Sequence, residues 1–114
     1  MQPLPSEPVV VKKRVSAHFG TELPLLLKSM HATEVVLAGV STSGVILSTV
    51  RWLADADYFI TVINDCCGDR DQEVHDVLCK KVFPRQATVV PLEKVLDSMQ
   101  SYTGRPVTPM VTPS

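Results

Sequence analysis

The chain has 114 residues, which leaves room for a single small domain. Its apolar fraction of 45% and mean hydropathy of +0.15 are typical of a globular protein and exclude a disordered chain. The formal net charge of −1 gives no electrostatic basis for a nucleic acid or membrane partner, and no apolar run approaches the roughly 20 residues of a membrane span.

The N-terminal part predicts a short strand that ends in a basic triplet. Residues 1–8 contain three prolines and are expected to form an extended lead-in. The β-branched run Val9–Val11 then favours a strand, with residues 12–14 (Lys-Lys-Arg) where that strand leaves the sheet.

The next segment predicts an amphipathic helix. Thr21 is a candidate N-cap, and Pro24 falls in the first turn, where a missing N–H group does no harm. Apolar residues at helical spacing follow and define one buried face: Leu23, Leu26, Leu27 and Met30.

Residues 35–40 do not alternate between polar and apolar, which indicates a central parallel strand buried on both faces. Residues 41–44 (Ser-Thr-Ser-Gly) form a small-residue turn, flanked by Gly39 and Gly44, whose backbone amides could hold an anion. A second helix follows with its apolar face at Val45, Ile46, Thr49, Val50 and Leu53.

The remaining pattern repeats this alternation of strand and helix. Residues 58–63 predict a strand that ends at Asn64 and Asp65, and residues 69–72 predict a polar turn. A third helix would bury Val74, Val77, Leu78 and Val82.

The C-terminal part predicts one more strand and one more helix. The strand is expected at residues 87–90, and the final helix would bury Leu92, Val95, Leu96 and Met99. Residues 101–114 have no hydrophobic period and predict a flexible tail.

The order of elements predicts an α/β fold with a parallel sheet, and right-handed crossovers would place helices on both faces. Ligands in such folds bind beyond the carboxyl ends of the strands. Any chemistry is therefore expected at residues 12–18, 40–45 and 65–68.

Three stretches resemble the isochorismatase-like cysteine hydrolases. KKRVSAHFGTEL, from Lys12 to Leu23, is similar to the family signature K-x-R-x-S-A-F-x-G-T-x-L, with His18 in place of the usual Phe. LAGVSTSGVILST, from Leu37 to Thr49, resembles G-V-x-T-x-x-C-V-x-x-T, and ITVINDCC, EVHDVL and ATVV fit the closing part. The resemblance covers roughly residues 8–92.

The resemblance implies a three-layer sandwich, with a six-stranded parallel sheet between helices, that hydrolyses small vinyl ethers, amides or carbamoyl compounds. Family members use an Asp as base, a Lys, and a nucleophilic Cys at a helix N-terminus, where the dipole favours the thiolate. A non-proline cis peptide, here Val40–Ser41, shapes an oxyanion hole that would also include Gly44.

Carried over by position, the family Lys falls on Lys12 and the nucleophilic Cys falls on Val45, which has no nucleophile. The Asp strand would lie upstream of Met1, so we expect a partial hydrolase domain over residues 9–100 that lacks its N-terminal strands. The expected function is that of a family hydrolase or a truncated, catalytically impaired member, and its enzymatic status stays open. The alternative is a non-catalytic relative that binds a small anion or a partner.

The remaining reactive side chains have mainly structural interpretations. Cys66 and Cys67 could supply a substitute nucleophile, although three cysteines make neither a disulfide framework nor a zinc motif, so we expect no metal or cofactor. Cys79 is expected to pack within the third helix, and His75 is expected to pack there or to lie on the helix surface. Asp65 is expected to cap the turn that follows it or to line a pocket. The cysteine content and the polar N-terminus indicate a cytoplasmic protein.

The expected partners are a small-molecule substrate and, through self-association, a second copy of the chain. Without the upstream strands, residues 35–40 would lose a neighbour in the sheet. The N-terminal strand could pair there directly, the chain could associate with another subunit, or it could fail to fold stably.

Overall fold

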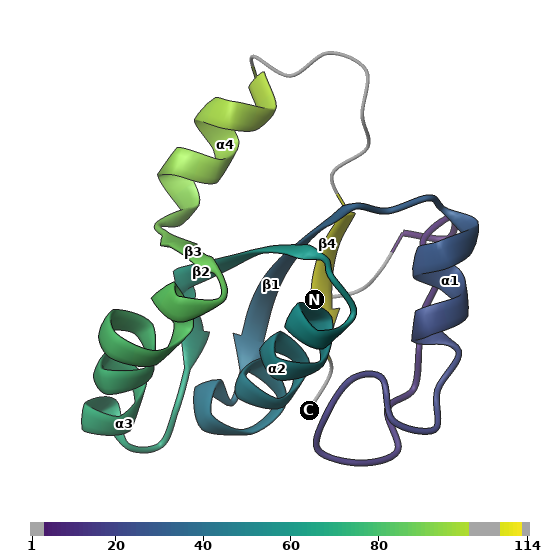
Figure 1. The fold of residues 1–114 in the computed structure, drawn as a ribbon. Coiled ribbons are helices and arrows are strands. Elements are labelled where there is room, and N and C mark those ends of the chain that lie inside the picture. The colour runs from purple at the N-terminus through teal and green to yellow at the C-terminus, as the bar shows by residue number, and fades with distance from the viewer. Residues whose placement is uncertain (1–3, 101–107, 113–114) are drawn as a thin grey trace.

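The computed structural model describes residues 4–100 and 108–112 (Figure 1). A central sheet is combined with α-helices and with short π-helical (η1, η2) and 3₁₀ (η3) turns. In chain order the elements are α1 (Leu23–Ser29), β1 (Glu34–Val40), η1 (Thr42–Ile46), α2 (Leu47–Asp55), β2 (Phe59–Gly68), α3 (Gln72–Val77), η2 (Leu78–Val82), η3 (Phe83–Arg85), β3 (Thr88–Val90), α4 (Leu92–Gln100) and β4 (Thr108–Thr112).

The sheet has the order β3-β2-β1-β4, and every neighbouring pair is parallel. β1 lies between β2 and β4, and its residues Val35, Val36 and Leu37 are at most 6% exposed although they point alternately to opposite faces. The predicted central strand is therefore confirmed, and so is the α/β class with a parallel sheet flanked by helices.

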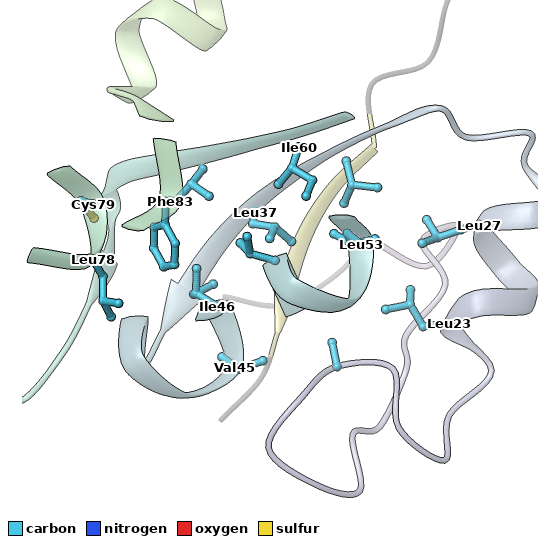
Figure 2. Packing of buried hydrophobic residues seen from close by; sticks show 14 residues of the cluster. Leu23, Leu27, Leu37, Val45, Ile46, Leu53, Ile60, Leu78, Cys79 and Phe83 are labelled. Carbon is cyan, nitrogen blue, oxygen red and sulfur yellow. The ribbon is translucent and has the colours of Figure 1, made fainter. Parts of the chain in front are cut away.

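One contiguous core joins this sheet to the helices (Figure 2). The predicted apolar face of the second helix is confirmed in full, since Val45, Ile46, Thr49, Val50 and Leu53 are all at most 4% exposed. α1 contributes Leu23 and Leu27 to the same cluster, and the segment after α3 contributes Leu78, Cys79 and Phe83. Each fully buried large side chain contributes about 1.5–3 kcal/mol through removal of apolar area from water.

The third helix buries only part of the predicted apolar face, since Leu78 is 8% exposed and Val82 packs partly buried against the core. Val74 and Val77 are 37% and 44% exposed, whereas His75 is only 9% exposed and continues a stripe through Cys79 to Phe83. The polar His75 interrupted the apolar pattern in the sequence, but its imidazole is hydrogen-bonded inside the protein and can therefore face the core.

α4 forms where the apolar spacing predicts it but projects away from the sheet (Figure 1). Leu92, Leu96 and Met99 are between 37% and 48% exposed. None of the helices in the described residues is long and apolar enough to span a membrane.

The two ends of the chain differ from the predictions. Residues 9–11 form no strand, because the edge of β1 that could receive a strand is already paired with β4. The flexible tail assigned to residues 101–114 is wrong for residues 108–112, which form β4 in register with residues 35–39 of β1. The rest of that tail, residues 101–107 and 113–114, lies outside the described residues.

Candidate functional site

The candidate site is the turn that leads from β1 into the helix formed by η1 and α2. The peptide bond between Val40 and Ser41 is cis, as the family resemblance implied. The carbonyl of Ser41 accepts hydrogen bonds from the amides of Gly44 (3.2 Å) and Ile46 (3.3 Å), which closes the turn. A Cβ atom on Gly44 would lie 2.7 Å from Oγ of Ser41, so this close approach is compatible only with glycine unless Ser41 moves.

Val45 occupies the position of the family nucleophile, in the first turns of this helix. Its side chain is 4% exposed and belongs to the hydrophobic core, together with Ile46 and Leu37 (Figure 2). An isopropyl group has no lone pair or acidic proton, so it offers neither a nucleophile nor a general acid or base at this position.

Lys12 lies in the segment that runs beside this turn. Val15 of that segment comes within 4.0 Å of the Cβ position of Gly44, and the amide of Ala17 donates a hydrogen bond to Oγ1 of Thr49 (3.2 Å). The ammonium of Lys12 donates to the carbonyl of Arg14 at 2.7 Å. The ammonium group of Lys12 is therefore hydrogen-bonded to the backbone of its own segment.

His18, in the same segment, replaces the usual Phe of the family. Its ring stacks on Trp52 with a centroid distance of 4.3 Å and an interplanar angle of 8°, a contact that a phenyl ring could also make. Burial lowers the pKa of His18, and its Nδ1 atom is buried without a hydrogen-bond partner among the described residues. A shallow depression beside it is lined by Arg14, Val15, Ser16, His18, Phe19 and Ser48.

Asp65 makes a hydrogen bond to a helix, a contact that the sequence did not indicate. Pairing between β1 and β2 shifts register between Leu37 and Gly39, so residues 63–66 of β2 form a bulge without partners in β1. From this bulge, Oδ1 of Asp65 accepts a hydrogen bond from the amide of Leu92 (2.9 Å). Asp65 therefore caps the start of α4, a helix distant in sequence, and not the turn that follows it.

Asp69 is a residue of this site that no sequence pattern indicated. Its Oδ2 atom accepts a hydrogen bond from the amide of Ser43 at 2.8 Å, and its Oδ1 atom accepts one from the amide of Asp71 at 3.1 Å. Hydrogen bonds from the side chain and backbone of Ser43, and then from Asp71, lower the pKa of Asp69. The sequence predicts a polar turn at residues 69–72, but this pattern does not indicate that Asp69 binds Ser43.

A buried chain of polar side chains lies beneath the same turn. Oγ1 of Thr42 is 2.7 Å from Nδ1 of His75, and Nε2 of His75 is 3.7 Å from Sγ of Cys79. Thr42 is fully buried, and the other two residues are at most 9% exposed. The prediction that Cys79 packs inside the protein is confirmed, and of the two positions expected for His75 the structure shows packing and not the helix surface. The sequence did not reveal that Thr42 joins them.

The three thiols have different environments. Cys66 is exposed, whereas burial raises the pKa of Cys67 to about 11. Burial, followed by the negative charge of Asp76, raises the pKa of Cys79. Within residues 4–100 and 108–112, no group of three or more His, Cys, Asp or Glu side chains is arranged to hold a metal ion.

Comparison with known proteins identifies relatives that agree with the family resemblance of the sequence. Residues 1–94 match the family model "Isochorismatase domain". The chain is 29% identical to maleamate amidohydrolase of Pseudomonas putida over 102 residues, which is 90% of this chain and 48% of that enzyme. It is 39% identical over 67 residues to a "Probable inactive nicotinamidase" of Arabidopsis thaliana, covering 58% of this chain and 34% of that protein.

Solved structures show the same fold. An isochorismatase family protein from Burkholderia thailandensis superposes with a TM-score of 0.84 at 24% identity, over 86% of this chain and 52% of that chain. A hydrolase described as an isochorismatase family member, from Chromobacterium violaceum, gives a TM-score of 0.80 at 28% identity, over 89% of this chain and 58% of that chain. The chain spans about half the length of several curated relatives that it matches, 48% in the case of the Pseudomonas enzyme. It belongs to the isochorismatase family.

Proposed function

We propose that this chain is a catalytically impaired member of the isochorismatase family, which does not hydrolyse substrates through a thiol at the turn from β1 into η1. The observation that carries this proposal is Val45, because a buried aliphatic side chain stands where the resemblance places the nucleophile. Lys12 cannot replace a nucleophile, since the catalytic residues of such sites act as a unit.

The thiols elsewhere in the chain support the same proposal. A thiol attacks as thiolate, and with a pKa of about 11 Cys67 is almost entirely protonated at neutral pH. Cys79 has a raised pKa and is 8% exposed, which also prevents a substrate from reaching it. Cys66 is exposed and is the thiol that a substrate could reach most easily, since Cys67 is only partly exposed and Cys79 is buried.

The relatives define the substrates for a test. Maleamate amidohydrolase acts on a small amide, and the name of the Arabidopsis protein refers to an inactive nicotinamidase, so small amides are the class to assay. Release of ammonia from maleamate and from nicotinamide would be measured at several pH values. The Pseudomonas enzyme is the positive control, and Cys66→Ser is the matched variant.

The expected result is no turnover above the uncatalysed rate for the wild type and for Cys66→Ser. Turnover by the wild type would contradict the proposal, and its loss in Cys66→Ser would identify the substitute nucleophile. The variant Val45→Cys places a thiol near the N-terminus of the helix. If this thiol reacts faster with iodoacetamide than Cys79, the turn still favours the thiolate form.

Binding of a small anion without hydrolysis is a second candidate function, because the turn already binds the carboxylate of Asp69. The amide of Ser43 is occupied by the carboxylate of Asp69, so a free anion would have to compete with it. We expect inorganic phosphate or maleate to raise the melting temperature of Asp69→Ala more than that of the wild type. Equal shifts in the two proteins would count against an anion site at this turn.

A further inference from the structure

The polar chain beneath the turn connects η1 with the continuous helical segment formed by α3 and η2, 33 positions later in the sequence. Thr42 begins η1 directly after the cis-linked Ser41, His75 belongs to α3, and Cys79 belongs to η2. We propose that His75 is a positioning residue, which fixes Thr42, and through it the turn of residues 41–45, from the neighbouring helix α3. This inference does not depend on whether the chain hydrolyses a substrate.

The chemistry of the three groups indicates which atoms donate. The thiol of Cys79 is protonated, since burial raises its pKa, and an imidazole nitrogen is a much better acceptor than a sulfur atom. We therefore assign the thiol as the donor to Nε2 of His75. In this assignment Nδ1 bears the ring hydrogen and donates to Oγ1 of Thr42 at 2.7 Å.

A second contact from the same part of the chain holds the adjacent residue of the turn. The carboxylate of Asp69, in the loop before α3, accepts the amide hydrogen of Ser43. Two consecutive residues, Thr42 and Ser43, are thus held by the segment of residues 69–75. The direction of the amides in the turn is set by α3 and its preceding loop as well as by the turn itself.

A catalytic role for the same three side chains does not fit their environment. A thiol, an imidazole and a hydroxyl in sequence resemble a nucleophile, a base and an orienting group. A substrate, however, would need access to Cys79, which is 8% exposed, and to His75, which is 9% exposed. The raised pKa of Cys79 also disfavours the thiolate. The arrangement therefore supports a role for His75 in positioning Thr42 and not a role in catalysis.

The first test needs no substitution. Long-range ¹H–¹⁵N correlation of the histidine rings in the wild-type protein distinguishes the two neutral tautomers. We expect His75 to be protonated at Nδ1 and unprotonated at Nε2. A ring protonated at Nε2 would overturn the assignment of donors.

The second test removes the hydroxyl of Thr42. In Thr42→Val the amide resonances of Ser43 and Gly44 should shift, and the equilibrium constant for unfolding should rise roughly tenfold, because Nδ1 of His75 is left buried without a partner. Thr42→Ser keeps the hydroxyl and should restore both the resonances and most of the stability.

A matched control separates positioning from loss of packing. Val50→Ala removes two methyl groups from a residue that is 1% exposed on α2, so it destabilises the protein while leaving the polar chain intact. Its Ser43 and Gly44 resonances should remain at their wild-type positions. If Thr42→Val leaves these resonances unchanged, or if Val50→Ala moves them equally, His75 does not position the turn.

Discussion

The carboxylate of Asp69 accepts the amide hydrogen of Ser43 at 2.8 Å, across 26 positions of sequence. This contact places a full negative charge at the first turn of the helix formed by η1 and α2, where the helix dipole favours an anion. It also ties the loop before α3 to the turn that follows β1.

Stability at acidic pH should depend on Asp69. The folded state lowers its pKa below the ordinary value of 3.8, so the ionised form stabilises the fold above that value, and the contribution is lost as the pH falls through the lowered folded value. Asp69→Asn should therefore be less stable than wild type at pH 6, and the difference should shrink towards pH 2. Urea unfolding at both pH values measures this. Glu34→Gln, at an exposed carboxyl group, is the control, and equal losses in the two variants would contradict the assignment.

Gly44 and Ser41 should show coupled effects on stability. A Cβ atom at Gly44 would lie 2.7 Å from Oγ of Ser41, so Gly44→Ala should destabilise the wild-type protein. In a Ser41→Ala background the same change should stabilise the protein by up to about 1 kcal/mol, because alanine is the better helix former. Thermal unfolding of the four proteins in this cycle measures the coupling, and additive effects would show that the contact is unimportant.

Phe83 and Phe59 provide a matched pair for testing the core. Phe83 is fully buried, whereas Phe59 is 74% exposed at the start of β2. Phe83→Ala should lower the free energy of unfolding by about 3–5 kcal/mol, and Phe59→Ala should change it by no more than about 0.5 kcal/mol. Similar losses in both variants, measured by urea unfolding, would contradict the arrangement of the core.

The three cysteines should react with iodoacetamide at clearly different rates. At pH 7.5, Cys66 should be alkylated first because it is exposed, and Cys67 and Cys79 should remain largely unmodified. The rate at Cys67 should rise steeply only as the pH approaches about 11, where its thiolate forms. Peptide mass spectrometry after timed quenching gives the rate at each site. Rapid labelling of Cys67 at pH 7.5 would contradict its raised pKa.

The fold was predictable where a single physical pattern decided the structure. The stripe from Val45 to Leu53 and the unbroken apolar run at residues 35–40 indicate a buried helix face and a central strand, and both are present. The predicted apolar face of the third helix was incomplete because it omitted His75, and a polar residue can occupy a core-facing position only if it finds a partner. That partner, Thr42, is 33 positions away.

The site was predictable in its location but not in its contacts. The resemblance placed the turn at Val40–Ser41 and the nucleophile position at Val45, and the structure places this turn at the carboxyl end of β1. The roles of Lys12 and of the oxyanion-hole turn in any reaction stay predictions. The carboxylate of Asp69 could not be assigned to Ser43 in advance, because the bulge in β2 that precedes it has no sequence pattern of its own.

Pairing of β4 with β1 has a consequence for the order in which the sheet assembles. Val35 pairs with Thr108, roughly 70 positions later, whereas Glu34 pairs with Phe59, roughly 25 positions later, so closing the longer loop costs about 1 kcal/mol more conformational entropy. β1 and β2 should therefore form the early unit, and β4 should join it last. During unfolding, β4 should detach first and briefly leave one edge of β1, the apolar central strand, unpaired.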